Sequence, residues 1–399
     1  MQRLQSTDLY MGPVKVKTQM VFNSISDDSP QSNNIAAYQD HIGNFMSRLQ
    51  IQKQLGQGGF GTAYLCKYVD PDTGDAQVVV AKIPNEVAQT MHENDFPDPI
   101  NRANTNGYQL QSLVEEFQKE AENVQLLIEG PIPRKLYPAG QPMRVKGSVL
   151  ADIRDALKSM KRHSGYAHIH KMLHLVQTPY PVLVSEACDG SLQNAIDGNA
   201  SGKCQWPNLL VTLYGFPNVW PSMCKQICDG INYMHSRGMA HMDIKPDNVL
   251  YKVNPHTKAI HCLIADFGAC VPADVLYKND KNHFVHTPFF FDRGVYDSPS
   301  GFIPQHADKY SVAVTLLALL VLQTQSVRHN TFQTSLNIQE WSSKLRTIVF
   351  KDSDAKSIFG ICSDIIEAGH TAQTSHDSRT LKYMELQEKM GHVPDIKSW

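Results

Sequence analysis

Apolar and polar residues alternate along the early part of the chain, which is the pattern of half-buried β-strands. Two segments alternate in this way, and a third ends in a run of β-branched residues that suits a strand buried on both faces. The pattern predicts three consecutive strands, at 49–56, 61–69 and 76–83. Weaker signals of the same kind predict further strands at 170–178, 181–184, 249–253 and 260–264.

Other segments repeat their apolar residues every three or four positions, as amphipathic helices do. One such segment covers 111–128, and another begins at Pro221, a residue type that favours the first turn of a helix. The apolar run 312–322 is too short to cross a bilayer and predicts a buried helix. Further helices are expected near 338–350, 355–369 and 379–390.

Three stretches interrupt these patterns. Residues 1–48 are rich in Ser, Asn, Gln and Asp, and we expect them to be mostly extended or disordered. The Pro-, Asn- and Asp-rich stretch 84–110 and the stretch 131–166 are predicted to be insertions. From Arg134 to Lys171 there are nine Lys and Arg residues against two Asp, so the second insertion is basic. A solvated surface helix or a docking site for an acidic or phosphorylated partner would each account for this charge.

The composition restricts the function only broadly. The 399 residues have a formal charge of −2 and are 42% hydrophobic, which suits a large buried core and predicts no general affinity for nucleic acid or membranes. The eight cysteines show neither a CxxC pair nor zinc-ligand spacing. The first residues contain no apolar stretch of signal-peptide length. We therefore expect reduced thiols and a cytoplasmic or nuclear location.

The strongest chemical signal is the segment 241–248, His-Met-Asp-Ile-Lys-Pro-Asp-Asn. Asp243 could accept a proton from an attacking hydroxyl, and Lys245 could neutralise a phosphoryl group in transfer. The amide oxygen of Asn248 could bind a metal ion. Phosphoryl transfer needs mainly positioning and charge stabilisation of this kind.

Three further motifs stand in a fixed order around this segment. The first is a glycine-rich stretch, Leu55 to Ala63, with the spacing G-x-G-x-x-G. Lys82 follows at the end of the run Val-Val-Val-Ala. The third motif is Asp266-Phe267-Gly268, just after the predicted strand 260–264. One glycine motif alone is weak evidence, but four motifs in register are strong evidence.

This ordered set resembles the protein kinase family over 50–393. The resemblance implies an α+β, bilobal protein kinase fold that binds ATP in the cleft between its lobes. A small β-rich N-lobe is expected at 49–186 and a larger α-helical C-lobe at 187–393, followed by a tail at 394–399.

The resemblance also implies roles for individual residues. Asp243 and Lys245 would act on the substrate hydroxyl and the phosphoryl group, and Lys82 would bind the α- and β-phosphates. Glu120 fits the family pattern best as the partner of Lys82, although a solvated helix glutamate is the alternative reading. The cofactors would be ATP and Mg²⁺, with the ion held by two residues, Asn248 and Asp266. The remaining nucleotide contacts would be made by Leu55, Gly56, Gln57, Gly58, Gly59, Phe60, Gly61, Ala63, Ala81, Lys82, Glu186, Cys188 and Leu250.

The sequence departs from the family pattern in two places. Met242 stands where an arginine usually precedes the catalytic aspartate and pairs with a phosphate on the activation segment. The usual Ala-Pro-Glu after that segment is also missing. Between Gly268 and Pro288 the only hydroxyl side chains are Tyr277 and Thr287, of which Thr287 resembles a structural threonine. We therefore expect activity that does not require phosphorylation of this segment.

Asp308 precedes the predicted buried helix and matches the family aspartate that anchors the catalytic loop, while an N-cap role is equally physical. His241 is expected to be a packing residue, with a role as general base as the alternative.

The function that follows is Mg-ATP-dependent phosphorylation of serine or threonine in a protein substrate. A pseudokinase or scaffold is the alternative, favoured by Met242 and by the missing Ala-Pro-Glu. A kinase of small metabolites is a third possibility, but Lys245 argues against it because such enzymes generally lack this lysine.

Overall fold

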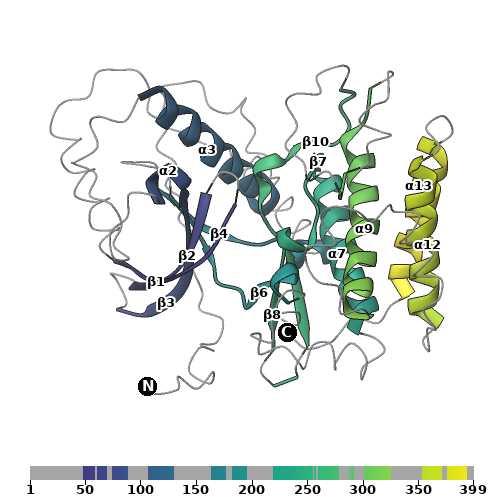
Figure 1. The fold of residues 1–399 in the computed structure, drawn as a ribbon, viewed down its shortest axis with the longest axis horizontal. Coiled ribbons are helices and arrows are strands. Elements are labelled where there is room, and N and C mark those ends of the chain that lie inside the picture. The colour runs from purple at the N-terminus through teal and green to yellow at the C-terminus, as the bar shows by residue number, and fades with distance from the viewer. Residues whose placement is uncertain are drawn as a thin grey trace, which may run out of the picture. The chain divides into compact units, whose positions relative to one another are not determined.

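The computed structural model resolves the chain into two compact units (Figure 1). Of the described residues, those within 48–125 and 171–187 form the first unit, and those within 126–129, 163–170 and from 188 onward form the second. The structure describes residues 48–58, 61–69, 74–88, 107–129, 163–176, 182–195, 219–254, 256–257, 259–277, 287, 289–291, 301–324, 353–370 and 375–392.

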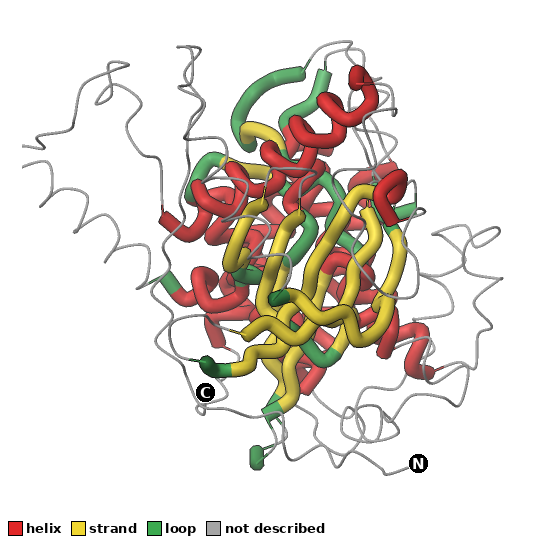
Figure 2. Tube along the Cα trace, turned by 90° about the vertical axis from the view of Figure 1, so that its left-hand side faces the viewer, coloured by secondary structure: helices red, strands yellow, loops and turns green. Residues whose placement is uncertain are grey.

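The first unit is built on a five-stranded antiparallel sheet with the order β1-β2-β3-β5-β4. Figure 2 draws its strands in yellow. The strands are β1 Leu49–Gln57, β2 Gly61–Val69, β3 Ala76–Pro84, β4 Met172–Val176 and β5 Val182–Glu186. The sequence pattern predicted all five, with ends that differ by at most three residues, because strand ends carry a weaker signal than strand centres.

Two helices accompany this sheet, the short α2 (Asn85–Ala88) and the long α3 (Gly107–Glu129). α3 begins four residues before the predicted start, and both helices extend into the stretch expected to be an insertion. Residues 89–106 of that stretch lie outside the described residues.

The alternation along β3 separates the core of the first unit from its second face. Val79, Ala81 and Ile83 are almost completely buried in a core that also contains Cys66 and Val184. Successive side chains of a strand point to opposite faces, so Val78, Val80 and Lys82 share the other face, where all three are partly exposed.

The second unit is mainly helical. Its long helices are α7 (Val219–Ser236), α9 (Pro304–Thr324), α12 (Ser353–His370) and α13 (Ser375–His392). Figure 1 shows α7, α9, α12 and α13 packed together, and each of them contacts the other three. The helix predicted at 312–322 is confirmed as part of α9, in which residues 312–319 are buried. The helix predicted at 338–350 lies outside the described residues.

Short strands and 3₁₀ turns position the loops between these helices. β8 (Val249–Val253) and β9 (Ile260–Ile264) form the predicted hairpin, which β6 (Gly190–Ser191) extends. A second small sheet pairs β7 (Met239–Ala240) with β10 (Val271–Pro272). The 3₁₀ turns are η3 Ser164–His168, η4 Pro246–Asn248 and η5 Phe267–Ala269. Within the described residues, no helix combines the length and hydropathy needed to cross a bilayer.

η3 belongs to the second unit, although the sequence placed it in the N-lobe, because it packs directly on α7. Tyr233 of α7 contacts the rings of His163 and Tyr166 and donates its hydroxyl proton to the carbonyl oxygen of Leu127. Burial raises the pKa of Tyr233 to about 12, so the hydroxyl remains a donor at neutral pH.

Four cysteines of the second unit lie in its core. Cys224, Cys228, Cys262 and Cys362 are at most 1% exposed, and burial raises the pKa of each thiol. Protonated, inaccessible thiols are poor nucleophiles, so these residues act as packing groups. Cys270 is also buried, which agrees with a structural role.

Gly165 is predicted to be indispensable to the packing of η3 on α7. A Cβ atom at this position would lie 1.9 Å from the carbonyl oxygen of Asp229 and 2.7 Å from Cβ of Tyr233. We expect Gly165→Ala to lower the free energy of unfolding by about 2 kcal/mol or more, because rigid backbone must move. Gly360→Ala is the matched control. Nothing lies within 4 Å of a Cβ added at this position of α12, so the substitution should raise the free energy of unfolding by up to about 1 kcal/mol. Urea unfolding midpoints of the two variants test this, and equal midpoints would contradict it.

Candidate active site

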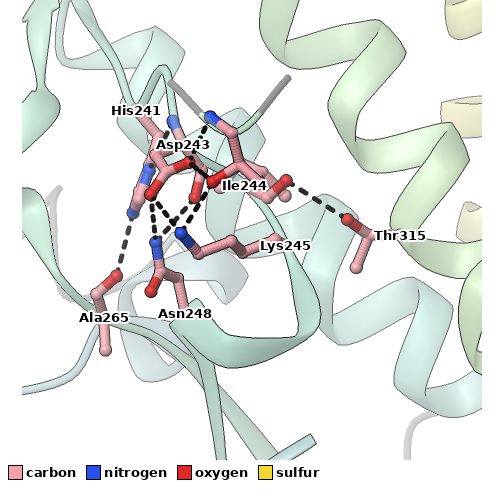
Figure 3. Close-up of polar contacts among 8 residues, drawn as sticks. His241, Asp243, Ile244, Lys245, Asn248, Ala265 and Thr315 are labelled. Carbon is pink, nitrogen blue, oxygen red and sulfur yellow. Dashed lines mark hydrogen bonds and ion pairs between the residues drawn. The ribbon is translucent and has the colours of Figure 1, made fainter. Parts of the chain in front are cut away.

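A cluster of polar side chains surrounds Asp243 in the loop between β7 and η4 (Figure 3). Nζ of Lys245 lies 2.8 Å from Oδ2 of Asp243 and donates to Oγ1 of Thr287, also at 2.8 Å. The Thr287 hydroxyl in turn donates to Oδ1 of Asp243 at 2.7 Å. A hydroxyl group is thus held between a carboxylate that can accept its proton and an ammonium group that can neutralise negative charge.

Asn248 completes this cluster. Its Nδ2 donates to the carbonyl oxygen of Asp243 at 2.7 Å and to Oδ2 of the same residue at 3.0 Å. Both bonds use the nitrogen, and Figure 3 shows the amide oxygen turned away from Asp243. Neither of these two bonds uses the amide oxygen of Asn248.

The β8–β9 hairpin brings Asp266 close to Asn248. Val249 pairs with Ile264, and the N–H of Ala265 donates to the carbonyl oxygen of Asn248 at 2.9 Å. Asp266 has an exposed carboxylate and a left-handed backbone, with φ 64° and ψ 72°. An amide oxygen beside a carboxylate is the hard donor set that Mg²⁺ prefers, so these two residues fit the ion that the sequence predicted here.

His241 is completely buried, and both of its ring nitrogens contact the backbone. Nδ1 accepts the N–H of Asp243 at 3.3 Å, so Nε2 carries the proton and donates to the carbonyl oxygen of Ala265 at 2.9 Å. The alternative reading of His241 as a general base is therefore wrong, because neither nitrogen is accessible to a substrate.

The helix α9 fixes the backbone of the loop that carries Asp243. Asp308 is completely buried, and its carboxylate accepts the N–H groups of His241 at 2.7 Å and of Met242 at 2.8 Å. His235 contacts the same carboxylate at 2.9 Å. Asp308 is the fifth residue of α9, which begins at Pro304, so the N-cap role is wrong and the anchoring geometry is the one observed.

Two turns further along α9, Thr315 also contacts the loop that carries Asp243. Its hydroxyl donates to the carbonyl oxygen of Ile244 at 3.4 Å (Figure 3). A single hydroxyl residue inside an otherwise apolar run was the available sequence signal for this contact.

Met242 has two unusual properties. Its φ of 70° is rare for a residue with a side chain, and its side chain is 1% exposed. It packs in an apolar cluster made by Ala240, Met242, Ala273, Phe291, Phe302 and Ala307. Tyr277 packs against this cluster and exchanges two backbone hydrogen bonds with Phe302. Apolar packing therefore joins the loop that carries Asp243 to the segment 273–277 and to Phe291 and Phe302.

In the first unit, the structure brings Lys82 and Glu120 together. Nζ of Lys82 lies 2.8 Å from Oε2 of Glu120, and the two side chains are 23% and 13% exposed. The ammonium group also lies over the ring of Phe117, 5.8 Å from its centre. Glu115 and Glu116 lie on the exposed side of α3.

The glycine-rich turn lies at the same end of the sheet as Lys82. Ala63 of β2 pairs with Lys82 of β3, and the N–H of Gly58 donates to the carbonyl oxygen of Gly61 at 2.9 Å. A Cβ on Gly61 would lie 2.8 Å from the carbonyl oxygen of Ile83, whereas a Cβ on Gly56 would meet nothing within 4 Å. The open backbone at Gly56 suits the approach of phosphate oxygens, whereas Gly61 is a glycine because no Cβ fits there. Gly59 and Phe60 lie outside the described residues.

The predicted contact of Ala81 with the nucleotide is wrong. Its side chain is completely buried in the core of the first unit, on the face opposite Lys82. The strand period of two places Val80 on the face of Lys82, where it pairs with Leu65. Val80 is therefore the candidate for the predicted nucleotide contact that the sequence analysis missed. The strand period, counted back two residues from Lys82, was the signal that identifies it.

The other predicted nucleotide contacts keep some exposure. Leu55, Gly56, Gln57 and Gly58 are exposed, whereas Ala63, Glu186, Cys188 and Leu250 are partly buried. The N–H of Glu186 donates to the carbonyl oxygen of Lys171 at 3.2 Å, so this donor already has a partner. Their contact with a nucleotide stays a prediction.

Comparison with known proteins assigns the chain to a family. The sequence profile of the protein kinase domain matches residues 144–380, more than half of the chain. The chain belongs to the protein kinase family. The matched range contains Asp243, Lys245, Asn248 and Asp266, whereas Lys82 and Glu120 lie before it. The α+β fold, with a β-sheet unit and a helical unit, agrees with this assignment.

Similar proteins carry serine/threonine-kinase names. The serine/threonine-protein kinase ELM1 of Saccharomyces cerevisiae is 25% identical over 195 residues, which are 44% of this chain and 30% of that protein. The serine/threonine-protein kinase ppk18 of Schizosaccharomyces pombe is 24% identical over 200 residues, 48% of this chain and 13% of that protein. A serine/threonine-protein kinase of Drosophila melanogaster is 41% identical over 56 residues, 14% of this chain and 8% of that protein. The chain thus spans less than a third of the length of each of these relatives.

The apolar environment of Met242 predicts a strong asymmetry between two substitutions. Met242→Arg would place a guanidinium group in the apolar cluster, and we expect a loss of at least about 3 kcal/mol in the free energy of unfolding. Met242→Leu conserves volume and apolarity and should cost less than about 1.5 kcal/mol. Denaturant unfolding of both variants measures the difference. A stable, fully folded Met242→Arg protein would show that the cluster does not confine this side chain.

Proposed function

We propose that this kinase transfers the γ-phosphate of Mg-ATP to serine or threonine hydroxyls of protein substrates. The observation that carries the proposal is the hydroxyl of Thr287, held at 2.7 Å from Asp243 and 2.8 Å from Lys245. A substrate hydroxyl bound by the same two groups would be oriented for attack, with an acceptor for its proton beside it.

Each residue of the second unit has a specific task in this proposal. Asp243 orients the hydroxyl and takes its proton, while Lys245 neutralises charge on the phosphoryl group. Asn248 and Asp266 hold Mg²⁺ through their oxygens, and the ion supplies charge neutralisation at the phosphates. Asn248 also fixes the Asp243 carboxylate through the 3.0 Å bond from Nδ2. Buried Asp308 keeps the loop backbone in the conformation that these roles require.

The first unit supplies the nucleotide-binding groups. Lys82 is oriented by Glu120 and would bind the α- and β-phosphates, while backbone N–H groups of the glycine-rich turn would cover the phosphate oxygens. Val80 and Ala63 lie on the same face of the sheet as Lys82 and offer apolar surface to a base.

Two observations favour a protein hydroxyl over other acceptors. Lys245 lies two residues after Asp243, the arrangement that the sequence resemblance associates with serine/threonine kinases, and it contacts Thr287. The similar proteins named above are serine/threonine-protein kinases. A docking role for the basic stretch 131–166 toward an acidic or phosphorylated partner remains a further proposal, since 131–162 lies outside the described residues.

Regulation by phosphorylation of the segment after Asp266 is not part of this proposal. An arginine at position 242 would call for a phosphate partner, whereas Met242 is satisfied by Phe291, Phe302 and neighbouring alanines. Apolar packing therefore replaces a charge pair in holding this segment against the catalytic loop.

Phosphate transfer to a generic basic protein tests the proposal. Wild type should transfer radiolabel from the γ-position of ATP in the presence of Mg²⁺, and the product should contain phosphoserine or phosphothreonine. Asp243→Asn keeps the shape of the side chain but loses its basicity, so turnover should fall about 10²- to 10⁴-fold. Lys82→Met and Asp266→Asn should reduce it by a comparable extent. Equal, near-zero transfer by wild type and Asp243→Asn, together with measurable ATP binding, would instead favour the scaffold function.

A phosphatase experiment tests the mode of regulation. Treatment of the purified kinase with a broad-specificity phosphatase should leave its turnover within about twofold of the untreated protein, because no phosphate is needed to order the segment. Tyr277→Phe should behave in the same way, since the ring that stacks on Phe302 is retained. Loss of activity after either change would mean that phosphorylation controls this enzyme.

A further inference from the structure

The side chain of Asn85 connects the two ends of the glycine-rich turn. Its Oδ1 accepts the hydroxyl proton of Thr62 at 2.8 Å, and its Nδ2 donates to the carbonyl oxygen of Gly58 at 2.9 Å. Gly58 is where the chain enters the turn from β1, and Thr62 is where it continues into β2. One amide group therefore links the entry and the exit of the turn.

The two ends of the turn are not held equally without this amide. Packing fixes the exit, because Gly61 lies against the carbonyl oxygen of Ile83, the ring of Phe117 and Cγ of Lys82, with no room for a Cβ. Thr62 is only 2% exposed. Gly58, in contrast, is exposed, and its carbonyl oxygen is bonded to Asn85. Asn85 therefore acts mainly on the entry side of the turn.

The chemistry of the contact requires an amide. The carbonyl oxygen of Gly58 can only accept a hydrogen bond, so the atom that faces it must be the NH₂ group, and this orients Oδ1 toward Thr62. An aspartate could accept from Thr62, but its carboxylate would face the Gly58 oxygen without a proton to donate. Alanine would make neither bond.

Asn85 also shares a strand end with Lys82. It directly follows Pro84 at the end of β3, three residues after Lys82, and Pro84 pairs with Gly61 across the β2–β3 register. The position of the turn is thereby tied to the same strand that carries the lysine. Both groups proposed to contact the phosphates are placed by one short piece of backbone.

We infer that Asn85 is a positioning residue that holds Gly58 and Thr62, the entry and the exit of the glycine-rich turn, in place before a nucleotide binds. The inference rests on the proposed ATP-dependent function. Glycine-rich segments lose much conformational entropy when they become ordered, and a turn that is already held loses less on binding. Asn85 touches no reacting atom in this view and acts through Gly58.

Nucleotide affinity and kinetics measure this effect. Asn85→Ala should raise Kd for Mg-ATP, measured by titration calorimetry, about tenfold, which corresponds to about 1.4 kcal/mol. KM for ATP should rise in parallel, while kcat changes less than about threefold and KM for the protein substrate stays constant, because the lost interaction acts on nucleotide binding. Asn85→Asp should weaken binding at least as much, and Thr62→Val, which retains the bond to Gly58, about twofold.

Hydrogen exchange separates a positioning role from a merely structural one. The N–H of Gly58 donates to the carbonyl oxygen of Gly61, so its exchange should accelerate in Asn85→Ala while the centres of β2 and β3 keep their protection. The melting temperature without nucleotide should change little, and the rise in melting temperature produced by Mg-ATP should shrink.

Asn254→Ala is the matched control. Oδ1 of Asn254 also makes two hydrogen bonds, from the N–H groups of His256 and Thr257, but within the β8–β9 turn of the second unit. This variant should keep wild-type affinity for ATP. Should Asn85→Ala fail to fold, Asn85→Asp and Thr62→Val carry the test through the same calorimetry.

The outcomes distinguish the inference from the function on which it rests. A wild-type protein that does not bind Mg-ATP would overturn the proposed function itself. ATP binding by wild type with unchanged or tighter binding by the Asn85 variants would overturn the role of Asn85 alone. Weaker binding together with unchanged Gly58 exchange would also contradict it, because the effect would then not pass through the turn.

Discussion

A buried carboxylate is the constraint on which the second unit depends. Asp308 is completely removed from solvent, and its charge is balanced by two backbone N–H groups and by His235. Leaving such a charge without these partners would cost several kcal/mol, so the loop that carries Asp243 has little freedom to move away. The rigidity of α9, packed among the other helices, is in this way passed to the residues that are proposed to do chemistry.

Other residues of the candidate site are also held in place, by ion pairs, hydrogen bonds or apolar contacts. Asp243 is held by Lys245 and Asn248, and Lys82 by Glu120, so both of these charged groups have fixed partners. The side chain of Met242 is held by apolar contacts, in a backbone conformation that costs about 1–3 kcal/mol for a residue with a side chain. Electrostatic and hydrophobic interactions thus share the task of preorganising one loop.

Much of this was readable from the sequence, and the errors have physical reasons. Periodicity predicted all five strands of the large sheet and the buried helix, and the family pattern selected Glu120 as the partner of Lys82. The assignment of Ala81 was wrong because neighbouring residues of a strand point to opposite faces, so Ala81 and Lys82 cannot face the same ligand. The N-cap reading of Asp308 failed because α9 begins at Pro304, before Asp308 and well before the apolar run 312–322 that marked the helix in the sequence. The contact of Thr287 with Asp243 and Lys245 joins residues more than forty positions apart, and no local pattern contains that information.

Tyr233 contacts the chain on both sides of a long intervening stretch. Its hydroxyl binds the carbonyl oxygen of Leu127 and its ring meets His163, so the two ends of that stretch are fixed at one side chain. Loss of the Tyr233 side chain would therefore release two attachments at once, the hydrogen bond to Leu127 and the ring contact with His163, although these residues lie far apart in the sequence.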